Sequence, residues 1–280
     1  MSLRKRFLPS AWYPDDSASA AREIDSRFDS LRGSVSPPRS SMAVVAPHAA
    51  WQYSGDLAAL AISTLRADAG TVIVFGGHLP SGSPPAMPEE DGFYCPLGTL
   101  RADAEFRDAL SARFDFAPDR RGDNTVEIQL PFIARRLPEA LFVCLRVPSS
   151  MLSYEIGKAA ASVALSLGRV AVAVGSTDLT HYGPNYGFSP MGEGRGALEW
   201  VKGTNDARFI ASMLEGNAEE ALRRAEAEGS ACSPGAAVAA LGFAEAMGCA
   251  KAALLGYSTS YDIAPASSFV GYAALSWESR

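Results

Sequence analysis

The chain has 280 residues, of which 48% are hydrophobic and 20% are charged, and 31 acidic residues against 25 basic ones give a formal net charge of −6. This composition excludes disorder as the main state and supplies enough apolar residues for a sizeable core. An acidic chain without a run of Lys and Arg is a poor partner for DNA, RNA or anionic lipid. We therefore expect neither nucleic-acid nor membrane binding.

The first half of the chain alternates short apolar runs, which are typical of buried strands, with amphipathic stretches, which are typical of helices. The pattern predicts a strand, a helix capped by Ser54, a strand, a helix and a strand, in this order: 42–46, 56–66, 71–75, 103–114 and 141–147. The stretch 79–88, rich in Gly, Pro and Ser, is predicted to be a long loop, and 34–41 is a short Ser/Pro tract.

The alternation continues in the second half. It predicts helices at 154–167, 205–214, 218–228 and 236–247, strands at 170–174, 252–257 and 269–277, and a long loop at 183–196. Strands that alternate with helices form a largely parallel or mixed central sheet covered by helices. The fold class is therefore α/β, and we expect one domain over residues 1–280.

The three histidines each follow a predicted strand. His48 comes after 42–46, His78 comes after 71–75 through two glycines, and His181 comes after 170–174. Ligands of open α/β sheets bind outside the carboxyl ends of the strands, so three strand ends can direct three imidazoles into one pocket. A lone histidine is more often structural, but the agreement of all three favours a site.

A divalent metal bound by imidazoles needs a further ligand, and the candidates are Asp178, Glu127 and Cys232. Cys232 stands directly before the predicted helix 236–247, where the positive end of the helix dipole favours a thiolate. A structural cysteine beside a helix start marked by Pro234 explains the sequence equally well at this point.

The flanks of the histidine segments carry aromatic residues, and we expect Trp12, Tyr53 and Tyr182 to line the pocket, although such residues also pack in cores. The four cysteines form no CxxC pair, which fits a reducing compartment. No apolar signal core follows the first basic residues and no apolar stretch reaches about 18 residues, so we expect a cytoplasmic protein.

Several motifs together resemble those of the Memo family, in the same order and over nearly the whole chain. They are Ala11-Trp12-Tyr13-Pro14, Ala46-Pro47-His48-Ala49-Ala50-Trp51-Gln52-Tyr53-Ser54-Gly55, Gly76-Gly77-His78, Cys95-Pro96-Leu97-Gly98, Val126-Glu127-Ile128-Gln129-Leu130-Pro131-Phe132 and Ser176-Thr177-Asp178-Leu179-Thr180-His181-Tyr182-Gly183. The Cys232 turn, Tyr257-Ser258 and Ser267-Ser268-Phe269-Val270-Gly271-Tyr272 extend the likeness. That family in turn resembles class III extradiol dioxygenases, which are α/β non-haem iron enzymes.

The resemblance implies a role for each site residue. His48, His78 and Cys232 match the family's metal ligands, and His181 matches the acid–base histidine of the dioxygenases, with Asp178 and Tyr53 as pocket residues. Dioxygenases use a carboxylate where Cys232 offers a thiolate, which suits iron first and also copper or zinc. The chain departs from the family at Asn124, where a histidine is usual, and at Ala50, where a glycine is usual.

Two classes of function follow from these residues. As an enzyme, the protein is a dioxygenase-like oxidoreductase on a small molecule, with His181, oriented by Asp178, transferring protons. As a binding protein, the same pocket takes a metal or a peptide side chain without turnover. The sequence leaves the substrate, the metal and the oligomeric state open.

Overall fold

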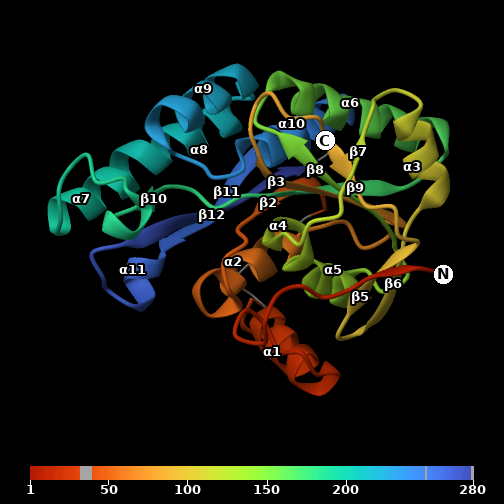
Figure 1. Cartoon of the computed structure of the whole chain (residues 1–280), viewed down its shortest axis with the longest axis horizontal. Helices are drawn as coiled ribbons and strands as arrows, with labels where there is room; N and C mark the ends of the chain where they lie inside the picture. The colour runs from red at the N-terminus through yellow and green to blue at the C-terminus, as the bar shows by residue number, and fades with distance from the viewer. Residues whose placement is uncertain (32–39, 250, 279–280) are drawn as a thin grey trace.

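A mixed β-sheet runs through the molecule, with helices on both of its faces (Figure 1). The computed structural model describes residues 1–31, 40–249 and 251–278. In the described residues the strand order of this sheet is β10-β12-β2-β9-β3-β8-β4-β7, and β11 pairs with β12. These strands are β2 (Ser41–Ala46), β3 (Thr71–Leu79), β4 (Ala86–Met87), β7 (Ala117–Pro118), β8 (Leu141–Pro148), β9 (Ala171–Ser176), β10 (His181–Tyr182), β11 (Lys251–Thr259) and β12 (Phe269–Glu278).

The centre of the sheet is parallel. Strands β2, β9, β3 and β8 lie side by side in parallel, whereas β12 is antiparallel to β2 and to β11. All residues of β2 and β9 are buried, as expected of strands that helices cover on both faces. The predicted α/β class with a mixed, helix-covered sheet is confirmed. The strands predicted at 252–257 and 269–277 are β11 and β12, and both belong to this sheet.

Two sets of helices cover the sheet. The helices are α1 (Ser17–Ser30), α2 (Trp51–Ser63), α3 (Ala104–Ser111), α4 (Asn124–Glu127), α5 (Leu130–Arg136), α6 (Met151–Ser166), α7 (Arg195–Trp200), α8 (Asp206–Leu214), α9 (Ala218–Glu228), α10 (Pro234–Ala246) and α11 (Ser260–Ile263), with short helices η1 (Pro184–Tyr186) and η2 (Val201–Asn205). One core contains α10, α6, α3, α8 and α9, and the core on the other face contains α1, α2 and α5. No helix among the described residues is long and apolar enough to cross a bilayer.

Helix α10 is deeply buried against the sheet beside the site. It packs on β9, β3, β2 and β8 and against α6. Close approach to α6 depends on Gly157, because a Cβ there would overlap the backbone of Ala239. The carbonyl of Tyr154 likewise leaves no room for a Cβ at Gly242. The Ala- and Gly-rich sequence of α10 therefore brings its N-terminus, and Cys232 just before it, onto the sheet.

Several predicted boundaries were wrong. Helix α2 begins at Trp51, not at 56, and Ser54 lies inside the helix, where its hydroxyl donates to the Ala49 carbonyl. Strand β3 continues to Leu79 because it resumes pairing with β8 after an irregularity beyond Gly76. The predicted loops contain β4, η1 and the start of α7. Most of the Ser/Pro tract 34–41, namely 34–39, lies outside the described residues.

A second, small sheet was not predicted. It has the order β1-β5-β6 in the described residues, from β1 (Leu3–Arg4), β5 (Gly92–Cys95) and β6 (Gly98–Arg101). Strand β1 is parallel to β5, so the N-terminal segment lies along the edge of the molecule beside α5 (Figure 1). Its strands are too short to produce a clear alternation in the sequence.

Candidate metal centre

Three neighbouring strands carry the candidate site. Strand β9 lies between β2 and β3, and the chain leaves β2 at Pro47-His48, passes through His78 at the end of β3 and leaves β9 at Thr177-Asp178. The turn before α10 adds Cys232. The ligand atoms of His48, His78 and Cys232 all lie within 4.8 Å of one another. The structure thus brings together three residues that are far apart in the sequence.

His48 is fixed through both its backbone and its ring. Its N–H donates to Asp178 Oδ1 over 2.7 Å, and its Nδ1 lies 3.3 Å from Ser176 Oγ. Gln129 donates to the same hydroxyl and to the Pro47 carbonyl, which locks the turn. With Nδ1 engaged, Nε2 is the free nitrogen, and it faces Cys232 Sγ at 3.2 Å.

His78 has an unusual backbone. Its φ of 59° is the positive value of a non-glycine residue, a conformation that costs energy and is often found at functional sites. Its N–H donates to Ser233 Oγ over 3.2 Å, and the preceding Gly77 N–H donates to Thr125 Oγ1 over 3.0 Å. A Cβ at Gly77 would overlap Ser233, so the Gly76-Gly77 pair is needed for this close approach.

The ring of His78 is held by Asp123. Its Nδ1 lies 3.1 Å from Asp123 Oδ2, so the ring donates from Nδ1 and Nε2 is left for a ligand. Asp123 was not predicted as a site residue. In the sequence Asp123 stands directly before the departure at Asn124, but a carboxylate that contacts a ligand histidine has no motif of its own.

Cys232 lies among the imidazoles as a thiolate. Its N–H donates to the Asp178 carbonyl over 3.2 Å, and the next N–H, of Ser233, donates to Thr177 Oγ1 over 3.0 Å. Burial alone would raise the pKa of the thiol, but His48, His181 and His78 outweigh it and hold the pKa well below its usual range. Pro234 is at the first turn of α10, so the structure agrees with the predicted helix start as well.

The pKa values of the two ligand imidazoles are raised, in contrast to that of the Cys232 thiol. Burial opposes the charged form of His48, yet the Asp178 carboxylate and the Cys232 thiolate raise its pKa to about 9. For His78, hydrogen bonds to Asp123 and Cys232 outweigh burial and raise the pKa to about 10. Without a metal, the site is therefore a thiolate paired with imidazolium groups, and a bound cation would replace their protons.

His181 and Asp178 lie beside the His48 ring of the candidate metal centre. Asp178 Oδ2 lies 3.8 Å from His48 Nε2 and 3.9 Å from His181 Nε2, which is too long for a hydrogen bond to either ring. Asp178, which we expected to orient His181, therefore meets this ring through an electrostatic contact and not a hydrogen bond, and its Oδ1 accepts a hydrogen bond from the His48 N–H. Burial raises the pKa of Asp178, against the effect of His48.

A cavity of about 370 Å³ opens over these residues. Its walls include the predicted Trp12 and Tyr53, and also two unpredicted aromatic residues, Tyr186 and Tyr272. Tyr186 stacks edge-on with the His181 ring at 4.9 Å between centroids. The departure Asn124 also lines the cavity, and its side chain donates to the His48 carbonyl over 3.1 Å. Ala50 precedes the first residue of α2.

Two predicted residues lie elsewhere. Tyr182 does not line this cavity; it is fully buried against Phe188, Trp200 and Phe269, because neighbouring residues of β10 face opposite sides. Glu127, a candidate ligand, instead accepts hydrogen bonds from the Phe7 and Leu8 N–H groups and from Tyr13. Its carboxylate therefore holds the N-terminal segment.

A buried polar network supports the turn between Asp178 and His181. Asp206 Oδ1 accepts hydrogen bonds from the N–H and hydroxyl of Thr180, and Oδ2 accepts one from Tyr257 over 2.7 Å. Asn205 donates to the Thr180 hydroxyl over 2.9 Å. The π-helix η2 directly precedes Asp206, and such local irregularities occur often beside functional sites.

This network predicts a pH effect on stability. Burial raises the pKa of Asp206 to about 6, against the hydrogen bonds from Thr180 and Tyr257. The folded state therefore favours the protonated acid, so its contribution is full below about pH 4 and is lost as the pH rises through 6, by about 3 kcal/mol. We expect Asp206→Asn to remove this slope. Denaturant unfolding of both proteins at pH 4.5 and 7.5 measures it, and an identical pH dependence in the two would contradict the assignment.

Comparison with known proteins gives a consistent result. The sequence model of the family described as Memo-like protein matches residues 4–276. A MEMO1 family protein of Pyrococcus furiosus is 27% identical over 288 residues, covering 98% of each chain. One of Methanopyrus kandleri is 32% identical over 244 residues, covering 83% of this chain and 81% of its own. One of Methanosarcina acetivorans is 29% identical, covering 98% of this chain and 99% of its own.

Proposed function

The chain belongs to the Memo-like family, and from that premise we propose that it binds a divalent metal through His48, His78 and Cys232 and uses His181 for proton transfer on a small substrate. The observation that carries the proposal is the approach of three donor atoms to within 4.8 Å at the carboxyl end of a parallel sheet. The sulfur is held as a thiolate, which is the form that metals bind.

The donor set fits a transition metal. Two imidazole nitrogens and a thiolate suit iron, copper or zinc and are a poor match for magnesium or calcium, which prefer oxygen. Asp123 and Ser176 contact the outer nitrogens of the two rings, which is the support that metal-binding histidines usually have. We propose iron as the first choice because the arrangement resembles that of extradiol dioxygenases, with a cysteine in place of a carboxylate.

The remaining residues would act on the substrate. A bound metal would supply Lewis acidity or redox chemistry at this centre. His181 lines the cavity with a side chain that is about one-third exposed, while its Nε2 is buried 3.9 Å from Asp178 Oδ2, and we assign to this ring the proton transfer to or from a bound substrate. The Cys232 thiolate and the Asp178 carboxylate outweigh burial and raise the pKa of His181. The buried Tyr272 and the half-buried Trp12 would exclude water around an aromatic or otherwise apolar substrate.

A binding role without turnover is the second candidate. It is favoured by Cys232, whose thiolate replaces the carboxylate of the dioxygenases, and by the aromatic walls of the cavity, which fit a peptide side chain as well as a small molecule. Anaerobic reconstitution with Fe(II), followed by oxygen-consumption measurements over catechols and related phenols, separates the two. Metal binding without oxygen uptake on any of them would favour the binding role.

The ligand assignment gives a direct prediction. Cys232→Ser replaces a thiolate with a hydroxyl, and we expect it to weaken zinc binding at least about tenfold, with a smaller effect on magnesium. Competition against a chromophoric chelator measures the affinities. Cys249→Ser is the matched control, because Cys249 lies after the far end of α10 and is not part of the ligand group. Equal zinc affinities for Cys232→Ser and wild type would exclude Cys232 as a ligand.

A further inference from the structure

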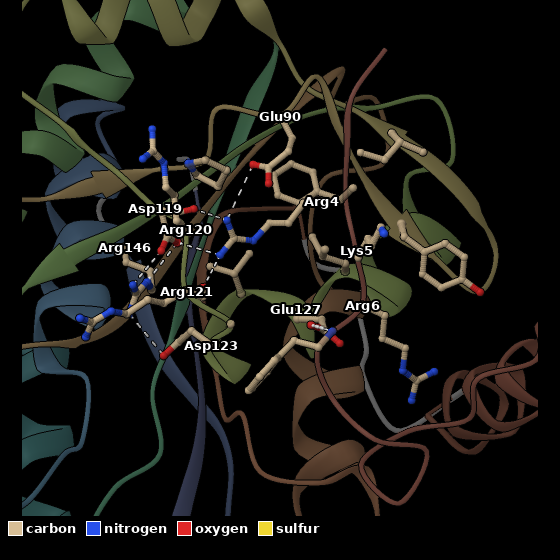
Figure 2. Close-up of a pocket in the computed structure, with 18 of the residues that line it drawn as sticks. Arg4, Lys5, Arg6, Glu90, Asp119, Arg120, Arg121, Asp123, Glu127 and Arg146 are labelled. Carbon is tan, nitrogen blue, oxygen red and sulfur yellow. Dashed lines mark hydrogen bonds and ion pairs between the residues drawn. The ribbon is translucent and has the colours of Figure 1, made fainter.

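A second cavity, of about 430 Å³, is lined by many charged residues (Figure 2). Its walls come from the N-terminal segment, from the loop between β7 and α4, and from β8. Asp123, the partner of His78, is among its lining residues. This cavity and the candidate metal centre therefore share one carboxylate.

Two arginines of this cavity, Arg4 and Arg146, have buried carboxylate partners. Asp119 forms ion pairs with Arg4 at 3.2 Å and with Arg146 at 2.7 Å, and Arg146 reaches Asp123 at 3.6 Å. Figure 2 shows these side chains converging from three segments of the chain. With the 3.1 Å contact of Asp123 and His78, they form a continuous series from the N-terminal segment to a proposed metal ligand.

The loop that carries Asp123 has no secondary structure of its own between β7 and α4. The N-terminal segment holds it: Arg4 donates to the Asp119 and Arg121 carbonyls, and the Phe7 ring packs on Gly122, where a Cβ would overlap the ring. This contact explains a phenylalanine that is 64% exposed. Arg146 holds the same loop from β8.

The contacts among Arg4, Asp119, Arg146 and Asp123 are shielded from water, whereas the His78 side chain at the end of the series is 36% exposed. The side chains of Asp119, Asp123 and Arg146 are 4%, 10% and 10% exposed, and that of Arg4 is 19% exposed. Charges at such depth interact more strongly than on the surface and have few alternative partners. A change at Arg4 is therefore expected to affect Asp123 through the ion pairs of Asp119 and Arg146.

We propose that Arg4 and Arg146 are positioning residues for His78: through Asp119 they fix the loop that presents Asp123 to the Nδ1 of this histidine. The inference rests on the proposed metal site, and it assigns the N-terminal segment a part in that site. Asp123 holds the ring with its Nε2 toward Cys232 and His48, and the two arginines keep Asp123 in place. Thr125 also holds the Asp123 carboxylate through its N–H, so the arginines share this task.

The test is a double-mutant cycle read out by cobalt(II) affinity and by the visible absorption of the cobalt protein. Asp123→Asn should weaken binding about 10- to 100-fold, the usual cost of losing a residue that orients a metal-binding histidine. Arg4→Gln should weaken it about 3- to 10-fold, because Arg146 and Thr125 remain. If Arg4 acts through Asp123, the double variant should bind no worse than Asp123→Asn alone.

Controls separate positioning from general destabilisation. Arg135→Gln removes another arginine–aspartate pair, with Asp25, that shares no residue with this series and should leave affinity unchanged. Arg4→Lys should recover part of the loss, and Arg146→Lys is a second variant in which the charge is kept and the fork geometry is lost. The proposal would be overturned if the losses of cobalt(II) affinity in Arg4→Gln and Asp123→Asn multiplied in the double variant. An unchanged cobalt(II) affinity in Arg4→Gln would overturn it as well.

A second measurement does not need metal. In the metal-free protein, the Hδ1 proton of His78, although its side chain is 36% exposed, should exchange more slowly than that of an imidazole without a hydrogen bond, because it is hydrogen-bonded to Asp123. We expect this resonance to be lost in Asp123→Asn, to exchange faster in Arg4→Gln and to be unchanged in Arg135→Gln. Unchanged exchange in Arg4→Gln would overturn the positioning role. If wild type bound no metal, the proposed function would fail while this measurement still decided the role of Arg4.

Discussion

Zinc affinity is expected to fall about 10⁴-fold when the pH is lowered from 8.5 to 6.5. Each zinc ion must displace a proton from His48 and one from His78, whose pKa values are raised to about 9 and about 10. Below those values both rings are charged, so affinity falls about 100-fold per pH unit. The Cys232 thiol adds no further dependence in this range because its lowered pKa keeps it deprotonated.

The slope of zinc affinity against pH tests whether the metal-free site is a thiolate paired with imidazolium groups. Ordinary imidazoles, with pKa values near 6.5, would already be neutral above about pH 7.5, and an ordinary thiol would then release one proton for each zinc bound. A slope of two between pH 7.5 and 8.5, measured by competition with a calibrated chelator, is therefore the expected result. A slope of one or less would contradict a thiolate paired with imidazolium groups, and circular dichroism at each pH checks that the protein stays folded.

Much of the fold followed from short-range patterns. The central strands β2, β8 and β9 are continuous apolar runs, which is why the sequence predicted them to within about two residues. Helix α9 was predicted with its observed bounds, since Asn217 caps it and Gly229 ends it in the left-handed conformation. Helix α1 was not predicted, although Asp16 caps it, because the helix buries only Ala20 and Ile24 and its apolar pattern is weak. The small β1-β5-β6 sheet was not predicted because its strands are short.

The site was predictable where residues follow strand ends. His48, His78 and Asp178 meet because β2, β3 and β9 are neighbours and parallel, so the position of each residue along its strand was enough. Asp123, Ser176 and Ser233 were missed because their roles depend on contacts with residues far away in the sequence. Tyr182 was assigned to the pocket on proximity alone, and the alternation of β10 turned it the other way.

His181→Ala is expected to leave metal content almost unchanged while lowering any turnover about 10²- to 10⁴-fold, the usual contribution of a general acid or base. The reason is its place in the structure. His181 lines the cavity and lies near Asp178, but it is not among the residues whose donor atoms form the ligand group. Its loss should therefore remove a proton-transfer group and spare the metal.

Elemental analysis after reconstitution and steady-state oxygen uptake together check this prediction, with His48→Ala as the contrasting variant that should lose the metal. Tyr186→Phe is a matched control beside the same ring: it keeps the aromatic contact at 4.9 Å and removes only a hydroxyl, so turnover should change little. A His181→Ala protein without metal would make His181 a ligand. A protein that keeps both its metal and its full turnover would show that the proton is carried by another group, of which Asp178, buried between the two imidazoles with a raised pKa, is the next candidate.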